Sequence, residues 1–554
     1  MRGDRNLTDQ ILAAEGMVGL ATRGALPWPR EARGANIDRR ALSRVIDGLR
    51  RENVSKTRTA WLAAVQALVV SARPDLAEQF EAYLGADPLV DEGSRGSNPL
   101  RGMTIGEIGV VYEALLALSN RRNRKARGQY FTPDDVAAFM AQQAAKFPEG
   151  TWLDPCCGVG NLSWHLAAAM DAPGDFVKHR LALVDIDLVA LKTATALIVA
   201  SFAPPEDRTV LPSLSERATA VDYLGNKPVP GHDFVLMNPP YAATAVRRSF
   251  RTGKTRDTFA YFLERASTAK GLVAITPASY LSAAKYAPVR EVVDEREGGD
   301  VYVFDNVPDT VFRGFKYGSA NTSQTNFVRA AILVSPPGAH GWRVTPILRW
   351  SARSRERLWA AAPLFLRDRH LGPGGQWAKI MPGTEEVWAY MESAPRKLRD
   401  LVTQEPTDFA LEVGSTPRYY VSATKRGLDR RSKHVLNFNS EADRQVAYLL
   451  LNSSLPYWWW RCLDGGVTLN RATLLSLPVP ESLKDLDPKA CAAFTSELEG
   501  SETRDLRIKL NAGRPNENVR RPRELSQRLD SAILSHVDFD FELLFSPDLF
   551  AESD

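Results

Sequence analysis

Leu153-Asp-Pro-Cys-Cys-Gly-Val-Gly-Asn-Leu162 is the stretch that most narrows the choice of fold. A short apolar strand ends at Asp154, a turn containing Gly158 and Gly160 follows, and a helical segment then begins. Glycine lets a backbone approach a ligand closely, and an acidic residue at a strand end can bind a cationic amine. A lone Gly-x-Gly also occurs in simple turns, and the third glycine of the dinucleotide fingerprint is absent, which argues against a nicotinamide or flavin site.

From about Gly150 to Ser335, apolar runs of strand length alternate with helix-like segments. Such alternation predicts an α/β fold whose sheet is buried on both faces. The predicted strands lie in TWLDP (151–155), LALVDID (181–187), DFVLMNPPY (233–241), GLVAITP (271–277) and AAILVSP (330–336).

The rest of the chain divides into two further regions. Before residue 120 the apolar residues follow a helical period, and we expect one helix from Ile105 to Ser119, after a linker at 87–102. After residue 335, aromatic, Arg and turn residues are interleaved without a repeat, and a charged helix-like segment follows at 521–537. The predicted domains are a helical region (1–120), a catalytic domain (121–335) and a C-terminal domain (336–554).

Composition excludes several classes of protein. The chain has 554 residues, 44% hydrophobic and 25% charged, with 4 Cys and a net charge of +4, so it is neither disordered nor a disulfide scaffold. No Cys or His spacing resembles a zinc site, and we expect no metal. The most apolar run, WLAAVQALVV, is too short to span a bilayer, and no signal peptide is evident, so we expect a cytoplasmic protein without a membrane partner.

Acidic residues end two further segments. Asp185 follows Gly160 by about 25 residues, close to the offset at which an acidic residue reaches ribose hydroxyls in doubly wound folds. Asp187 competes for this role, although it also suits the N-cap of the next helix. Asp222 and Tyr223 precede a Gly-rich turn and offer one acceptor and one flat ring, which suits an adenine group; alone, this pair carries little weight.

The strongest signal is Asn238-Pro239-Pro240-Tyr241 at the end of an apolar strand. The two prolines stiffen the backbone and remove two N–H donors, which leaves carbonyl groups as acceptors. An exocyclic amino group on a base is a poor nucleophile, and accepting both of its hydrogens, through Asn238 and the Pro239 carbonyl, would help localise its lone pair. Tyr241 could stack on the base. The alternative, a rigid turn, is weakened by the position of this motif at a strand end.

In these motifs the sequence resembles the N6-adenine-specific DNA methyltransferases of the gamma class, from restriction-modification systems. DPCCGVG looks like their S-adenosylmethionine loop, NPPY like their catalytic motif, and Gly128-Gln-Tyr-Phe-Thr-Pro-Asp-Asp-Val136 like the segment before the loop. The resemblance covers residues 105–335 well. Within the last segment, Thr132 suits an N-cap, Pro133 the first helical position, and Asp134 and Asp135 the positive helix start.

The resemblance implies a fold, a reaction and a set of roles. The fold is a Rossmann-like methyltransferase core with a helical N-terminal region and a C-terminal mixed target-recognition domain. The enzyme transfers a methyl group from S-adenosyl-L-methionine to N6 of an adenine flipped out of double-stranded DNA, in a restriction-modification or orphan system. Asn238, Pro239, Pro240 and Tyr241 are catalytic, Phe312 is a base-stacking candidate, and the cofactor-binding residues are Tyr130, Thr132, Asp154, Gly158, Gly160, Asp185, Asp222 and Tyr223.

The resemblance extends more weakly to the C-terminal region. LNSSLPYWWWR (451–461) is similar to parts of target-recognition domains, although at least two of its three tryptophans are better explained as core residues. The segment 417–434, PRYYVSATKRGLDRRSKH, interleaves Arg and Tyr and would suit a DNA-reading surface. A cluster of five cations at 121–127 is explained equally well as a solvated loop or as a phosphate-binding element.

Three alternatives remain open at this stage. The chain could methylate RNA or a protein amide, although such enzymes need far less chain. A fused nuclease would carry Glu-x-Lys or Gln-x-Lys, and neither is present, so we expect methylation without cleavage by this chain. Whether it acts with a cognate restriction endonuclease or a partner subunit stays open. A catalytically silent DNA-binding or assembly subunit is the third alternative, and the intact Asn238 and loop glycines argue against it.

Overall fold

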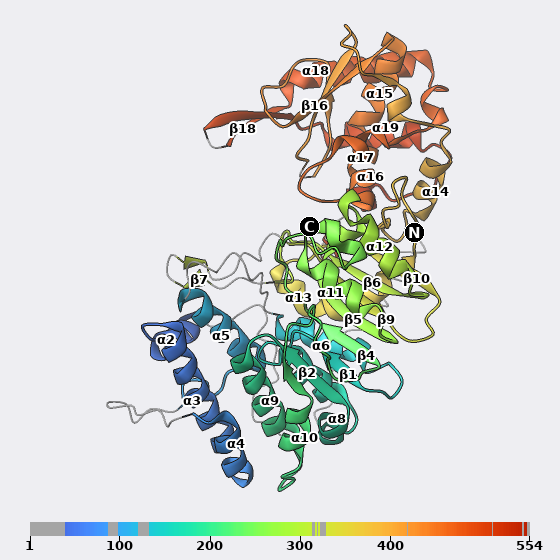
Figure 1. The fold of residues 1–554 in the computed structure, drawn as a ribbon. Helices are drawn as coiled ribbons and strands as arrows, with labels where there is room; N and C mark the ends of the chain where they lie inside the picture. Colours follow the sequence, from blue (N-terminus) through green and yellow to red (C-terminus); the bar gives the residue numbers. More distant parts are fainter. Residues whose placement is uncertain are drawn as a thin grey trace.

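The computed structural model describes residues 39–86, 98–119, 132–312, 316–317, 320–321, 328–417, 419–511, 513–545 and 548–550. Figure 1 shows an α/β body flanked on one side by N-terminal helices, with a second body, formed by the C-terminal elements, stacked on it. Within the described residues, no helix combines the length and the apolar composition needed to span a bilayer.

A nine-stranded sheet forms the centre of the α/β body, in the order β11-β10-β6-β9-β5-β4-β1-β2-β3. β1 pairs in parallel with both β2 and β4, whereas β9 runs antiparallel between β5 and β6. The strands are β1 (Trp152–Asp154), β2 (Leu181–Asp185), β3 (Ala218–Ala220), β4 (Phe234–Met237), β5 (Gly271–Pro277), β6 (Gly298–Phe304), β9 (Ala330–Ser335), β10 (Gly341–Leu348) and β11 (Arg367–Asp368).

The strand order reverses at β1, since β2 and β4 lie on its opposite sides. In open α/β sheets, ligands bind outside the carboxyl ends of the strands at such a switch point. The fold therefore places the candidate site above the ends of β1, β2 and β4, where the sequence analysis placed its motifs.

Helices cover both faces of this sheet, because alternate residues of each strand are apolar on both sides. In β4, Phe234 and Leu236 enter one hydrophobic cluster, whereas Val235 and Met237 enter another. The first cluster includes residues of α6 (Asp134–Ala144), α7 (Asn161–Ala169), α8 (Pro173–His179), α9 (Leu188–Phe202) and α10 (Val210–Glu216); the second includes residues of α11 (Thr258–Ala266) and α12 (Ala287–Asp294).

The N-terminal helices extend the first cluster beyond the sheet. They are α2 (Arg39–Leu49), α3 (Val54–Ala72), α4 (Ala77–Leu84) and α5 (Ile105–Ser119). Thr104 and Glu107 form a reciprocal capping box at the start of α5, which explains why this helix begins at Ile105. Trp61 of α3 donates from Nε1 to Thr193 of α9 at 2.9 Å and so fixes these helices against the α/β body.

The C-terminal body has its own core. Buried residues of α14 (Glu385–Ser393), α15 (Glu441–Asn452) and α16 (Leu455–Leu463) pack against a four-stranded antiparallel sheet and α19 (Arg523–Ile533). The remaining elements are α17 (Arg471–Leu475), α18 (Pro488–Arg504), β13 (Val402–Thr403), β14 (Ala410–Gly414), β15 (Ala423–Thr424), β16 (Lys433–Phe438), β12 (Arg396–Lys397), β17 (Pro478–Val479), β18 (Leu506–Asn511) and β19 (Arg514–Val519).

The predicted α/β fold is confirmed, and each of the five predicted strands is present. The sheet, however, continues beyond residue 335, where the sequence analysis ended the catalytic domain, since β10 and β11 are its last two strands. Pro336, Pro337 and Gly338 lie in the turn between β9 and β10. α13 (Arg355–Ala361) also packs on the first hydrophobic cluster, so this body extends to about residue 368.

Candidate functional site

The glycine loop connects β1 to α7 across the end of β2. Gly158 has a φ of +53° and Gly160 a φ of +93°, which are left-handed values that favour glycine. A Cβ atom at Gly160 would lie 2.9 Å from Ala194 Cβ of α9, whereas one at Gly158 would meet nothing within 4 Å. Gly160 therefore allows the loop to pack closely on α9, and Gly158 borders open space.

Asp185, the last residue of β2, holds this loop from the neighbouring strand. Its Oδ2 accepts a hydrogen bond from Gly158 N at 2.8 Å, and its Oδ1 accepts one from Asp187 N at 2.8 Å. The side chain is buried, and burial raises the pKa of Asp185 above its ordinary value. Both oxygens thus lie at the junction of the loop with α9, beside the open side of Gly158.

Asp187 is the N-cap of α9, as the sequence analysis suggested. Its Oδ1 accepts from Val189 N at 3.0 Å, and its Oδ2 accepts from Tyr112 Oη at 3.0 Å and forms an ion pair with Arg58. Arg58 and Tyr112 come from the N-terminal helices α3 and α5. No local sequence signal identifies them, because their contact with Asp187 depends on how α3 and α5 pack against α9.

Asp154 lies beneath the loop. Its Oδ2 accepts from Ser163 Oγ at 2.8 Å, and its Oδ1 accepts from Cys156 N at 3.3 Å. Burial raises the pKa of Asp154 to about 7. These contacts tie the turn to the first helical residues, so the side chain stabilises the shape of the loop in this structure.

Asn238 and Thr132 are joined directly. Asn238 Nδ2 donates to Thr132 Oγ1 at 2.9 Å, and the Thr132 carbonyl accepts from Asn161 Nδ2, in the first turn of α7, at 2.7 Å. The backbone carbonyl of Asn238 accepts a hydrogen bond from Cys156 Sγ at 3.3 Å. The glycine loop, Thr132 and the end of β4 therefore form one connected unit, and the sequence analysis missed the roles of Cys156 and Asn161 in it.

The predicted N-cap at Thr132 is wrong. The helix α6 begins at Asp134, its N-cap residue is Pro133, and the Thr132 hydroxyl bonds to Asn238 instead of to the helix. The acidic first turn is confirmed: Asp134 accepts from Thr104 Oγ1 at 2.7 Å, and Asp135 forms a buried ion pair with Arg355 at 2.6 Å.

Tyr241 lies between two phenylalanines. Its ring makes edge-on contacts with Phe259 at 6.3 Å and Phe312 at 5.8 Å between centroids, and its hydroxyl donates to the Ile275 carbonyl at 3.0 Å. Phe312 is fully buried. The structure thus brings the predicted stacking candidate Phe312 into contact with Tyr241.

Arg355 positions the segment that carries Phe312. Its guanidinium donates to the Thr310 carbonyl at 2.7 Å and to the Val311 carbonyl at 2.9 Å while it holds the Asp135 carboxylate. Trp359 also donates to Asp135, at 2.9 Å. Because Asp135 belongs to α6, this cluster couples Phe312 to the helix that follows Thr132.

Asp222 and Tyr223 lie at the far side of the site, after β3. The Asp222 side chain is exposed, and its Oδ1 accepts from Leu224 N at 3.0 Å. The Tyr223 ring is buried against Phe262, and the Arg265 guanidinium lies over the ring, 4.7 Å from its centroid. The ring is thus enclosed by protein.

Two predicted features lie outside the described residues, namely Tyr130 and the cations at 121–127. In the C-terminal body, Trp458, Trp459 and Trp460 are all buried, which confirms them as core residues. Trp459 stacks on Trp388 with centroids 5.1 Å apart.

Several solved structures are similar to this chain. One is the DrdV–DNA complex, at 13% identity and a TM-score of 0.42, with 85% of this chain and 54% of that chain covered, so this chain spans about half the length of DrdV. Another is a putative class I S-adenosylmethionine-dependent methyltransferase from Listeria monocytogenes, at 17% identity and a TM-score of 0.33, with 56% of this chain and 93% of that chain covered. A third is the type I restriction-modification system methyltransferase subunit from Streptococcus thermophilus, at 15% identity and a TM-score of 0.30, with 54% of this chain and 69% of that chain covered.

A comparison with curated proteins finds none that matches the chain. One family model does match part of it. Residues 104–180 fit the model described as N-6 DNA Methylase, a segment that includes α5, α6, β1 and the glycine loop.

Proposed function

We propose that this chain is an S-adenosylmethionine-dependent DNA methyltransferase that methylates N6 of an adenine flipped out of a duplex. The observation that carries the proposal is the hydrogen bond from Asn238 Nδ2 to Thr132 Oγ1. It joins an acceptor-rich strand end to the segment beside the glycine loop, so that the two halves of a methyl-transfer site are next to each other. The match of residues 104–180 to the N-6 DNA Methylase model supports the same reaction class.

The residues at the switch point suit S-adenosylmethionine. Gly158 leaves open space where any other residue would place a Cβ atom, and Asp185 offers two carboxylate oxygens for ribose hydroxyls beside it. Asp222, exposed after β3, is an acceptor for an adenine amino group. Thr132 with its turn and Asp154 beneath the loop are the other described residues that we assign to the cofactor site. The cofactor would supply an electrophilic methyl group on a sulfonium, which needs no metal and no covalent enzyme intermediate.

Asn238 and Pro239 would bind the target amino group. With Nδ2 committed to Thr132, the amide presents Oδ1 as its acceptor, and the Pro239 carbonyl supplies a second one from a backbone that Pro240 stiffens. Two acceptors on one amino group align its lone pair and stabilise the positive charge that develops on nitrogen during transfer. Positioning and fixed dipoles then account for most of the rate enhancement.

Tyr241 and Phe312 would enclose the extruded base. Reaching the amino group inside a duplex requires the base to be flipped out, at a cost of a few kcal/mol. Stacking on Tyr241, after Phe312 has moved aside, would repay part of that cost. Arg355 holds the segment of Phe312 by backbone carbonyls, which lets the ring move while its support stays in place.

A methyl-transfer assay with the purified protein tests the proposal. Tritiated S-adenosylmethionine is incubated with duplex DNA of high sequence complexity, with RNA and with protein, beside an Asn238→Ala variant. Label in DNA that the variant lacks, with cofactor binding retained in calorimetry, is the expected result. Label in RNA or protein alone would refute the DNA assignment, and cofactor binding without transfer to any substrate would favour a silent or partner-dependent subunit.

A further inference from the structure

The strands β18 and β19 form an antiparallel ribbon that projects from the C-terminal body (Figure 1). Register pairs Arg507 with Asn518, Lys509 with Asn516 and Asn511 with Arg514. Since side chains alternate between the two faces of a strand and paired residues share a face, the face of Arg507 also carries Lys509, Arg514, Asn516 and Asn518. We call these five residues the basic face; it contains three cations and no acid.

The opposite face has a different composition. It carries Leu506, Ile508, Leu510, Pro515, Glu517 and Val519. Ile508 is 61% and Leu510 71% exposed, while Glu517 is buried at the base of the ribbon. The one charged residue of this face, Glu517, is thus held inside the body. In the projecting part of the ribbon, one face is apolar and the other is basic.

The base of the ribbon is firmly anchored. Glu517 Oε2 accepts from Arg426 at 2.6 Å and from Asp429 N at 2.9 Å, and Arg430 donates to the Glu517 carbonyl at 3.2 Å. Arg430 also hydrogen bonds to Asn518, at the inner end of the basic face. An isolated two-stranded ribbon is marginally stable in water, so these contacts explain how this one keeps its geometry.

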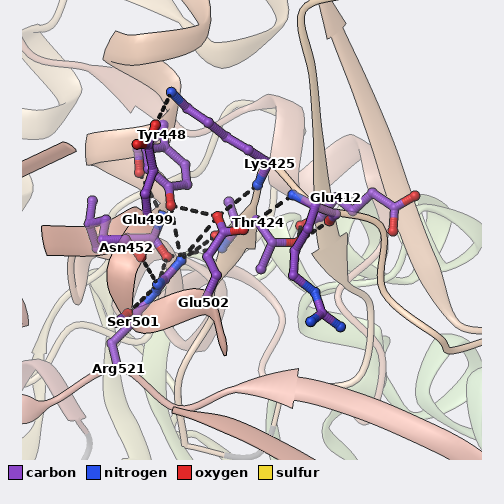
Figure 2. A network of polar contacts seen from close by, with 12 residues as sticks. Glu412, Thr424, Lys425, Tyr448, Asn452, Glu499, Ser501, Glu502 and Arg521 are labelled. Atoms are coloured by element: carbon purple, nitrogen blue, oxygen red, sulfur yellow. Dashed lines mark hydrogen bonds and ion pairs between the residues drawn. The ribbon is translucent and has the colours of Figure 1, made fainter. Parts of the chain in front are cut away.

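A second layer of polar contacts supports the anchor (Figure 2). Arg521, two residues after β19, is buried; it donates to Asn452 Oδ1 at 3.0 Å and to the Ala423 carbonyl at 2.7 Å. Glu502 of α18 accepts from Tyr448 Oη at 2.6 Å and from Lys425 N at 2.8 Å. The network joins α15, α18, the 423–426 segment and the end of the ribbon.

Three cations of the predicted reading segment are held in ion pairs with carboxylates, whereas the three cations of the ribbon are not. Lys425 pairs with Glu499, Arg426 with Glu517, and Lys433 with Glu412. By contrast, Arg507, Lys509 and Arg514 are exposed, and none has a carboxylate oxygen within 4.0 Å among the residues that the structure describes.

Tyr420, in the predicted reading segment of the C-terminal body, is near enough to Arg507 of the basic face to feel its charge. Burial raises the pKa of Tyr420 above its ordinary value, and Arg520, Arg430 and Arg507 lie close enough to oppose that rise. Tyr419, next to it, is 52% exposed.

We propose that the ribbon enters the major groove of duplex DNA with its basic face toward the DNA. This proposal rests on the proposed function, and it names the element that docks on the substrate. The B-form major groove admits a two-stranded ribbon. Lys and Arg neutralise phosphates or bind guanine, and Asn binds adenine, so these side chains supply both affinity and readout. Three exposed cations on a face that carries no acidic side chain suit a polyanion such as DNA.

Binding of the full-length chain to a fluorescent duplex of mixed sequence tests the proposal. The triple variant R507Q/K509Q/R514Q is compared with R399Q/K484Q/K489Q, which removes three exposed cations from other elements of the same body. Affinity is measured by anisotropy over a range of salt concentrations, cofactor binding by calorimetry, and thermal unfolding as a folding control. Since each phosphate contact contributes about 0.9 to the salt slope, the ribbon variant should lose about 2 to 3 of that slope and at least about tenfold in affinity at low salt.

The control variant should change affinity by less than about threefold, and both variants should bind cofactor as the wild type does. Equal behaviour of the two variants, with wild-type DNA binding intact, would overturn the ribbon proposal and leave the proposed function standing. Ribbon-dependent binding of A-form duplex RNA as tight as that of DNA would also overturn it, because that major groove is too narrow for side-chain access. Cofactor binding with no affinity for any duplex DNA in the wild type would overturn both proposals.

Discussion

Thr132 and Asn238 are 106 residues apart in the chain, yet a hydrogen bond of 2.9 Å joins their side chains. An amide group is nearly symmetrical in shape, so the partner of Nδ2 decides which way Oδ1 faces. Thr132 is therefore a positioning residue for the acceptor that the proposed reaction needs. Its sequence neighbourhood indicated a contact with the cofactor or a helix cap. Neither interpretation predicted its hydrogen bond to the Asn238 side chain.

Replacing Thr132 by Val keeps the shape of the side chain and removes the acceptor for Asn238 Nδ2. We expect kcat to fall by about tenfold, which corresponds to roughly 1.4 kcal/mol, because the amide loses its fixed orientation in the transition state. Single-turnover methylation kinetics measure the effect. Thr132→Ser, which retains the hydroxyl, should recover most of the rate. An unchanged kcat in Thr132→Val would exclude the positioning role.

At the scale of elements, the two glycines of the loop have different roles: Gly160 packs against α9, and Gly158 faces the space open to a ligand. The Cβ of an alanine at 160 would lie 2.9 Å from Ala194 Cβ and 3.1 Å from Ala194 Cα, at a φ of +93°. At Gly158 the φ is +53° and no atom lies within 4 Å. A side chain at 160 would therefore disturb the packing of the loop on α9, whereas a side chain at 158 would fill the space that a ligand could occupy.

Gly160→Ala should lower the free energy of unfolding by about 2 to 4 kcal/mol, since overpacking adds to the cost of the left-handed backbone. Gly158→Ala should cost only about 1 kcal/mol of stability, from the backbone alone, but should weaken cofactor binding more than tenfold if the cofactor occupies the open side. Urea unfolding and calorimetry measure the two quantities. Equal stability losses would contradict this division between the glycines.

The sequence predicted the elements whose pattern is local. The strands β1, β2, β4, β5 and β9 are apolar runs, and α5 begins at a Thr-x-x-Glu capping box, so short-range chemistry defines them. By contrast, β6 (GGDVYVF) and β10 (GWRVTPIL) include polar residues and Gly, which hid them from a search for apolar runs. The antiparallel direction of β9 depends on the chain path after β6, which no local pattern records.

The same distinction applies to the site. Gly158, Asp185 and Asn238 were predicted because parallel strands bring their carboxyl ends together at one edge of a sheet. Arg58, Tyr112 and Arg355 were not predicted, because each reaches the site region from a helix that is distant in sequence from the motif it contacts. The basic face of the ribbon was missed because its Arg, Lys and Asn residues alternate with apolar ones along β18.

At the scale of the whole molecule, buried charges join the α/β body to the C-terminal body. Asp305, after β6, pairs with Arg461 of α16 at 2.8 Å and with Arg329 at 2.8 Å. Lys379 is buried nearby and donates to Ser282 Oγ, the Trp377 carbonyl and the Leu463 carbonyl at 2.9–3.0 Å. Burial lowers the pKa of Lys379 to about 7.

This lowered pKa predicts a pH dependence of stability. Between about pH 7 and pH 10.5 the unfolded chain holds a proton on Lys379 that the folded chain has released, so the free energy of unfolding should rise with pH there. The contribution between pH 7 and pH 9 is roughly 2 kcal/mol. Lys379→Met should remove this part of the dependence. The free energy of unfolding of both proteins is measured by urea unfolding at several pH values. If it changes with pH equally in the wild type and in Lys379→Met, Lys379 does not titrate in this range.

The identity of the methylated atom tests the central claim most directly. Duplex DNA is incubated with the purified chain and S-adenosylmethionine carrying a deuterated methyl group, digested to nucleosides and analysed by mass spectrometry. The account predicts the heavy methyl group in N6-methyldeoxyadenosine, with none formed by the Asn238→Ala variant. Heavy methyl on cytosine, or a variant as active as the wild type, would contradict it.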